Sequence, residues 1–111
     1  MEVSRVARLL RRYERAEARL FTSGEIEYCG SRSERLAARF AAKEAVFKAL
    51  GSGKGEGMRW HDVEVVNAAN GRPAVRLDGA VAELARRSGV REVEISLSHT
   101  HELAIAQAVA V

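Results

Sequence analysis

Glu44 and Lys48 are the two residues whose types and spacing best suit chemistry, because they lie four apart in a stretch with helical periodicity. Side chains four apart share one helix face, where an exposed acid–base pair contributes roughly a few tenths of a kcal/mol and needs no further role. Ala37 and Ala41 precede Glu44 by two turns and one turn on that face. Small side chains there leave room for a shallow recess, which favours a site.

The chemistry that such a site suits involves phosphate. Glu44 is a hard oxygen ligand suited to Mg²⁺, which binds one or two carboxylates together with substrate phosphates and water. Lys48 can neutralise a phosphate or exchange a proton. Arg39 can hold a phosphate through two parallel hydrogen bonds, although a surface salt bridge, for example with Glu34, explains its position equally well. The glycine-rich residues 51–57 match neither the P-loop nor the dinucleotide-binding pattern, so a flexible connector is their simpler interpretation.

Two histidines, His99 and His101, follow a predicted strand and are two residues apart. That spacing puts both rings on one side of a strand and raises the question of a zinc site. The pattern lacks a third ligand, because Cys29 is remote and His61 stands alone, whereas zinc sites need three or four. Turn chemistry accounts for these polar residues, although strand ends also commonly carry catalytic groups.

The composition indicates one small globular domain. The chain has 111 residues, a net charge of +3 and a pI of about 9.5, so anionic partners are favoured. Aromatic residues make up only 5%, which is poor for base stacking on nucleic acid. Cys29 is the only cysteine, no run is apolar enough to span a membrane, and no secretory leader pattern is visible. We expect a soluble cytoplasmic protein that binds neither nucleic acid nor membrane.

The periodicity predicts helices first and hairpins afterwards. Helices are expected over residues 2–12 and from Thr22 or Ser23 onward, the latter with Glu25 in its first turn. A longer helix is expected over 33–50, capped either by Ser31 together with Glu34 or by Ser33. Strands are expected over 62–66 and 73–77 around an Asn-Gly turn, a helix over 80–88, and strands over 92–98 and 103–111. The last strand places small alanines on one face, which would allow another element to approach closely. Segregated helices and antiparallel pairs indicate an α+β fold.

The segment 39–53, RFAAKEAVFKALGSG, resembles the central signature of the holo-acyl-carrier-protein synthases, R-F-A-A-K-E-A-x-x-K-A-x-G-x-G. The segments 21–25, 62–65, 70–73 and 95–100 follow in the family's order, so the resemblance covers nearly the whole chain. It implies one α+β domain over 1–111 with the 4'-phosphopantetheinyl transferase-like fold, an antiparallel sheet and a long central helix. It also implies a homotrimer with active sites at subunit interfaces.

The resemblance implies an enzyme that moves 4'-phosphopantetheine from coenzyme A to a serine of apo acyl carrier protein, with Mg²⁺ as cofactor and 3',5'-ADP as the product released. Glu44 matches the metal-binding glutamate, and Lys48 matches a lysine that activates the serine or neutralises charge. Arg5 and Arg12 match the face that docks the acidic carrier. The residues matching the coenzyme site are Arg39, Lys43, Gly51, Ser52, Gly53, Pro73, Ser98, His99 and Thr100.

The chain departs from the family at its start. The family opens with a strand that ends in G-x-D-x-x-E, and the aspartate of this motif is a second metal ligand. In this chain Glu2 matches the glutamate of the motif, and the first strand and the aspartate are missing. A start codon read too late, a truncation or a degenerate relative each explain this, and we favour the first because the downstream signature is intact.

Two other classes of function remain open. A catalytically silent module that binds coenzyme A or the carrier would fit the missing aspartate, and turnover with Mg²⁺ would distinguish it from the transferase. A small basic nucleic-acid binder fits the pI, but no known motif supports it.

Overall fold

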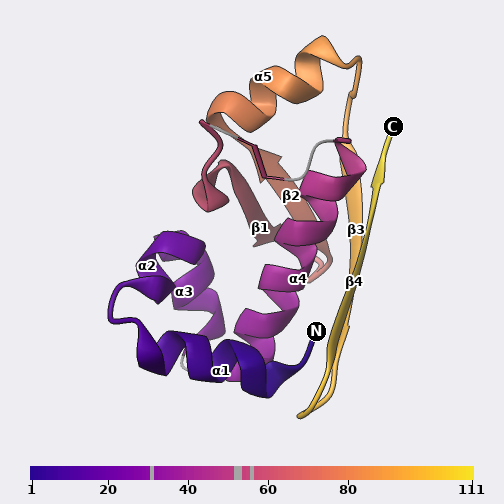
Figure 1. Ribbon diagram of the computed structural model, residues 1–111. Helices are drawn as coiled ribbons and strands as arrows, with labels where there is room; N and C mark the ends of the chain where they lie inside the picture. Colours follow the sequence, from indigo (N-terminus) through magenta and orange to yellow (C-terminus); the bar gives the residue numbers. More distant parts are fainter. Residues whose placement is uncertain (31, 52–53, 56) are drawn as a thin grey trace.

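The computed structural model describes residues 1–30, 32–51, 54–55 and 57–111. Its N-terminal half is helical, and two β-hairpins flank a helix in the C-terminal half (Figure 1). The helices are α1 (Val3–Arg12), α2 (Ala16–Leu20), α3 (Ser23–Cys29), α4 (Ser33–Ala49), a short 3-10 helix η1 (Trp60–Asp62) and α5 (Gly79–Arg87). The strands are β1 (Val63–Asn67), β2 (Pro73–Leu77), β3 (Val93–His99) and β4 (Ala104–Ala110). The α+β prediction is confirmed, and α2 is the helix that the periodicity missed.

The long helix α4 is the central element of the fold. It lies between α1–α3 on one side and the β3–β4 hairpin on the other (Figure 1). Alanine and other strong helix formers dominate its sequence, and Leu36 and Phe47 are buried in the core. The N-cap is Arg32, so the alternative cap at Ser33 is wrong; Ser31 lies outside the described residues. The structure of α4 sets where its functional side chains point.

The alternation in β4 brings the hairpin close to α4. Ala104 is fully buried against Ala37 and Ala38 of α4, while Ile105 and Val109 are 61% and 58% exposed on the other face. The pairing of β3 with β4 runs from Val93 opposite Ala110 to His99 opposite Ala104. The prediction that small residues permit a close approach is therefore confirmed, and an apolar strip is left on the outside.

The two hairpins form separate two-stranded antiparallel sheets. In the first, Val63 pairs with Leu77 and Asn67 with Pro73, and Gly71 adopts φ 85° in the turn. Only glycine adopts such an angle readily, which explains the Asn-Gly signal. The predicted strand began one residue too early, since Asp62 belongs to η1.

The first two residues are extended along the edge of β4. Glu2 forms an antiparallel bridge with Leu103, the Met1 amine donates to the Ala104 carbonyl at 2.9 Å, and the Ala104 amide donates to the Met1 carbonyl at 2.8 Å. The chain therefore enters α1 directly from an antiparallel pairing with β4.

Gly79 at the start of α5 lies against the buried side chain of Asp62. It has φ 55°, and a Cβ there would sit 2.8 Å from Asp62 Oδ1. Asp62 is held by the Arg59 amide at 3.0 Å, so its carboxylate has little room to retreat. We expect Gly79→Ala to lower the free energy of unfolding by about 1–3 kcal/mol, because backbone strain and overpacking add. Urea denaturation measures this loss.

The matched control is Gly89→Ala. Gly89 also has a positive φ, 75°, but no atom of the described residues lies within 4 Å of the position that its added Cβ would occupy, so only backbone strain applies. Equal losses in the two variants would show that the contact with Asp62 is unimportant.

Candidate active site

The structure places five of the predicted site residues in two hollows on different sides of α4. The first, the α4–β4 hollow, has a volume of about 360 Å³ and contains Glu44 and Lys48. The second, the arginine hollow, has a volume of about 270 Å³ and contains Arg39, Pro73 and His99. Neither group contributes a residue to the other hollow. A single copy of the chain therefore keeps the predicted catalytic pair apart from these predicted coenzyme ligands.

The α4–β4 hollow presents an acid and a base without pairing them. Glu44 is half-buried and Lys48 is exposed, and the two side chains form no ion pair with each other. Ala41 and Ala45 line the hollow, which confirms the predicted recess in part, whereas Ala37 is fully buried beneath α1. Both charged groups remain open to an outside ligand.

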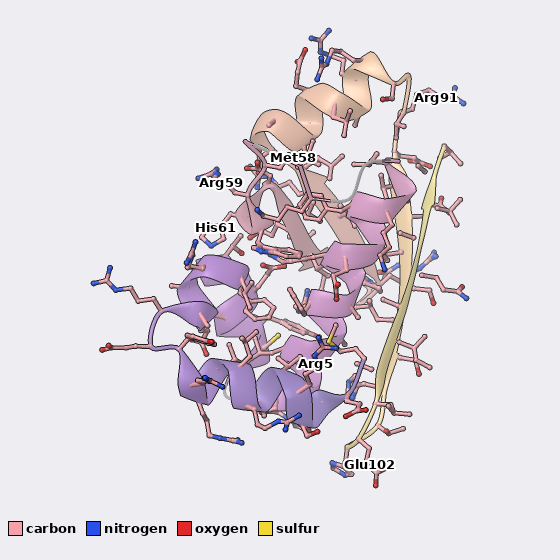
Figure 2. The ribbon with its side chains drawn as sticks, viewed as in Figure 1. Arg5, Met58, Arg59, His61, Arg91 and Glu102 are labelled. Atoms are coloured by element: carbon pink, nitrogen blue, oxygen red, sulfur yellow. The ribbon has the colours of Figure 1, made fainter. Side chains whose placement is uncertain are left out.

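Glu44 also faces a third cavity, the α1 hollow, of about 480 Å³. Its other charged lining residues are Arg5, Arg8 and Arg12 on α1, and its apolar wall includes Phe40. Figure 2 labels Arg5 where α1 approaches α4. The arginine-rich face of α1 thus adjoins the predicted metal ligand and is suited to an anionic partner.

Lys43, which the resemblance assigned to the coenzyme site, lines neither hollow. Its ammonium is fully buried and lies 2.6 Å from the Glu25 carboxylate. It also donates to the carbonyls of Leu20 at 2.8 Å and Trp60 at 3.0 Å, which uses all three donors. Burial lowers the pKa of Lys43, while the Glu25 carboxylate opposes that shift. Lys43 is a structural cation that joins α4 to α3 and to the segment before β1.

Glu25 is the other half of this buried ion pair. The predicted position of Glu25 in the first turn of a helix is confirmed, because Thr22 and Glu25 form a reciprocal capping box at the start of α3. Its second oxygen accepts from the Val65 amide at 2.8 Å, so the same carboxylate reaches β1. The orientation of α4 relative to α3 and β1 is therefore fixed through one carboxylate.

Arg39 is a buried arginine with fixed geometry rather than a surface salt-bridge partner. It donates to the Val65 carbonyl at 2.7 Å and to the Asn67 side-chain oxygen, and its guanidinium lies 4.3 Å from the centre of the Tyr28 ring. Glu34, the alternative partner, pairs with Arg32 instead at 3.2 Å. Arg39 forms part of the wall of the arginine hollow, and His99 lines the same hollow from an exposed position.

Three further predicted ligands, Ser98, Thr100 and Gly51, line neither hollow. Ser98 is exposed and pairs with Ile105, and the Thr100 hydroxyl accepts from the amides of Glu102 and Leu103, as expected for turn chemistry. Gly51 has φ 95° and closes the turn after α4. Ser52 and Gly53 lie outside the described residues.

Tyr28, Arg35 and Asn67 line the arginine hollow but were not predicted. Asn67 ends β1 and Tyr28 lies near the end of α3, so only the packing of three elements brings them together. Arg35 precedes Arg39 by one helical turn, and that spacing was the one signal available.

Comparison with known proteins identifies the family of the chain. A model of the 4'-phosphopantetheinyl transferase superfamily matches residues 1–108. The chain is 48% identical over 111 residues to the holo-acyl-carrier-protein synthase of Moorella thermoacetica, covering 97% of this chain and 86% of the relative. It is 42% identical over 113 residues to that of Koribacter versatilis, covering 98% and 90%.

Solved structures of the same enzyme superimpose on the whole chain. The Helicobacter pylori holo-acyl-carrier-protein synthase, in complex with coenzyme A, gives a TM-score of 0.89 at 26% identity and covers 100% of this chain and 95% of the other. The Neisseria meningitidis enzyme gives 0.90 at 28% identity, with 100% and 92% coverage. This chain therefore belongs to the 4'-phosphopantetheinyl transferase superfamily.

Proposed function

We propose that this protein transfers the 4'-phosphopantetheine group of coenzyme A to a serine of apo acyl carrier protein and releases 3',5'-ADP. The observation that carries the proposal is that α4 presents Glu44 and Lys48, which form no ion pair with each other, in an open hollow beside an arginine-rich surface. Membership of the superfamily supports the reaction class. We place the reaction in the cytoplasm, with a fatty-acid carrier as the default partner.

The proposed reaction needs positioned charge more than covalent chemistry. The serine oxygen attacks the β-phosphorus of coenzyme A, the bond from that phosphorus to the bridging oxygen breaks, and the bridging oxygen leaves with 3',5'-ADP. Lys48 stands where it can offset charge on the phosphates or help the serine to lose its proton. Its exposed position leaves the ammonium free to follow the phosphate.

The residues present fit Mg²⁺ bound largely through the substrate. Glu44 offers one carboxylate, and in the described part of the chain no group of three or more His, Cys, Asp and Glu side chains could hold a metal by itself. Mg²⁺ is commonly held by one or two carboxylates, with phosphates and water completing its shell. When bound, Mg²⁺ would neutralise charge on the pyrophosphate; Glu44 would hold it beside Lys48.

We further propose that the protein acts as a homotrimer. The α4–β4 and arginine hollows are separate in one copy, so a complete site requires the Glu44 hollow of one subunit and the arginine hollow of its neighbour. The exposed apolar strip on β4, which includes Ile105 and Val109, supplies a surface that a second copy can cover. Light scattering should therefore give three times the mass of the 12.1 kDa chain.

We propose the face of α1 that carries Arg5 and Arg12 as the carrier-docking surface. Both side chains are exposed and line the α1 hollow that Glu44 also reaches. We expect Arg5→Glu and Arg12→Glu each to raise the KM for the carrier about tenfold or more, because reversed charges repel an acidic partner. The KM for coenzyme A should stay within about twofold, and steady-state kinetics at two salt concentrations measure both.

The control for docking is Arg86→Glu on α5. Arg86 is exposed and pairs with Glu83 at 2.5 Å, away from the hollows. Equal effects of this variant and of Arg12→Glu on the carrier KM would contradict a specific docking surface.

The direct test of function is the intact mass of apo acyl carrier protein after incubation with this 111-residue protein, coenzyme A and Mg²⁺. A gain of one phosphopantetheine that disappears without metal supports the transferase. Binding of coenzyme A or carrier without any mass gain supports the silent binding module instead. Absence of both turnover and binding refutes the two together.

A second preparation tests whether a second carboxylate belongs to the metal site. It carries an added upstream segment with Gly-x-Asp, the aspartate lying three residues before Glu2. Continuing the antiparallel register of Glu2 with Leu103 would place that residue opposite Ala106, which lines the α4–β4 hollow. A lower Mg²⁺ concentration for half-maximal rate in this preparation supports a two-carboxylate site.

A further inference from the structure

A fourth cavity, the α1–α2 groove, lies outside the proposed transfer chemistry. It is found where α1, α2 and the segment before β1 meet (Figure 1). Its volume of about 630 Å³ exceeds that of the α1 hollow, the α4–β4 hollow and the arginine hollow. Apolar side chains from these elements form its floor: Leu9, Ala16, Leu20 and Trp60. A cavity of this size with an apolar lining is typical of a small-molecule site.

The floor of the groove is held in place by the core of the protein. The Trp60 ring lies 4.9 Å from the ring of Phe40 and 5.4 Å from that of Phe47, measured between centroids. The carbonyls of Leu20 and Trp60 both accept from the buried Lys43 ammonium, at 2.8 Å and 3.0 Å. A ligand would therefore meet a surface that folding has already ordered, which lowers the entropic cost of binding.

The rim of the groove is cationic. It carries one carboxylate, that of Glu14, and four cations: Arg12, Arg15, Arg19 and Lys54. All four cations are exposed, and none forms an ion pair with a carboxylate among the described residues. The Lys54 ammonium lies 5.8 Å from the centre of the Trp60 ring, so a positive charge stands directly at the apolar floor. This combination is complementary to a ligand with an apolar body and one anionic end.

We propose that the α1–α2 groove binds a long-chain carboxylate, whose alkyl chain lies on Trp60 and whose head group contacts Arg15 and Arg19. An unbranched alkyl chain suits the floor because it brings no polar group that would need a hydrogen bond there. Arg12 and Tyr13 line both this groove and the α1 hollow. An occupied groove therefore removes part of the proposed carrier-docking surface, and the ligand inhibits in competition with the carrier. Binding goes beyond the proposed function, and only the inhibition rests on it.

The fluorescence of Trp60 measures binding directly, because Trp60 is the only tryptophan of the chain and lines the groove. Titration with dodecanoate below its micelle concentration should change the emission and reach saturation. Shorter carboxylates should bind more weakly, by about two- to fourfold for each methylene removed. Dodecanol has the same chain without the charge and should bind about tenfold more weakly than dodecanoate or worse. Circular dichroism should stay unchanged, and a parallel loss of helix signal would overturn the proposal as denaturation.

A double variant tests the cationic rim. Arg15→Gln with Arg19→Gln should lower the affinity for dodecanoate to about that for dodecanol and leave dodecanol binding within about twofold. The matched control is Arg72→Gln with Arg91→Gln, which removes two exposed arginines that line neither the groove nor an ion pair among the described residues. A double variant that weakens both ligands equally, or neither, overturns the site. Binding to anionic phospholipid vesicles without saturable binding of monomeric dodecanoate also overturns it, in favour of a membrane surface.

Intact-mass kinetics test the inhibition separately from the site. Dodecanoate should raise the KM for the carrier in proportion to its occupancy of the groove and leave kcat within about twofold. An unchanged KM at saturating dodecanoate would overturn the competition with the carrier. If the protein transfers no phosphopantetheine at all, the proposed function fails, whereas the Trp60 titrations still decide whether the groove binds the carboxylate.

Discussion

Glu44→Gln is expected to reduce phosphopantetheine transfer by on the order of 10²- to 10³-fold, a loss typical of removing one preorganised electrostatic group. The amide keeps the shape of the carboxylate but loses its charge and thus its affinity for Mg²⁺. Glu44 is half-buried on an open face and forms no ion pair with any of the described residues. Its removal should therefore leave the unfolding midpoint nearly unchanged.

Intact-mass kinetics over a range of Mg²⁺ concentrations measure this effect. The variant should need more metal for its half-maximal rate, which a purely structural change would not produce. Glu83→Gln on α5, which alters an exposed carboxylate paired with Arg86, is the control. A Glu44→Gln enzyme with the unaltered rate and metal dependence would remove Glu44 from the site.

Lys43→Met is expected to have the largest effect on stability. Lys43 and Glu25 are both 0% exposed as side chains and lie 2.6 Å apart. Breaking such a pair by removing one partner costs about 3–5 kcal/mol, because the remaining charge stays buried without compensation. Domains of this size have only about 5–15 kcal/mol of total stability, so the variant should unfold at a far lower denaturant concentration.

Lys48→Met provides the contrast, five residues further along α4 and on a different face. Lys48 is exposed in the α4–β4 hollow, so its loss should cost stability less than about 0.5 kcal/mol while it lowers activity. Urea unfolding followed by circular dichroism measures both variants. Similar midpoints for Lys43→Met and Lys48→Met would contradict a structural role for the buried pair.

Local patterns were enough to predict the placement of Glu44 and Lys48. Both lie on one helix, and the 3.6-residue period fixes their common face without reference to the rest of the fold. The same helical period also indicated a structural role for Lys43, but the resemblance to the family led us to assign that residue to the coenzyme site. Lys43 lies between Phe40 and Phe47 in the apolar stripe, at the core-facing position. A lysine there indicates a buried cation with a dedicated partner.

The partner itself could not be predicted from the pattern around Lys43. Glu25 was assigned to the first turn of a helix, which is correct, but its carboxylate also reaches Lys43 and Val65. Those contacts depend on how α3 packs on α4 and β1, and no local periodicity specifies that packing. Tyr28 was missed for the same reason, since its ring meets Arg35 and Arg39 only in the folded chain.

The separation of the two hollows has a consequence for mixed populations of subunits. Consider an assembly that joins the Glu44 hollow of one copy to the arginine hollow of another. If every subunit carries the same damaged hollow, every site in the assembly is inactive. When subunits with a damaged Glu44 assemble with subunits with a damaged Arg39, some interfaces pair the two intact hollows. Two inactive alleles would then complement each other, whereas two alleles damaged in the same hollow would not.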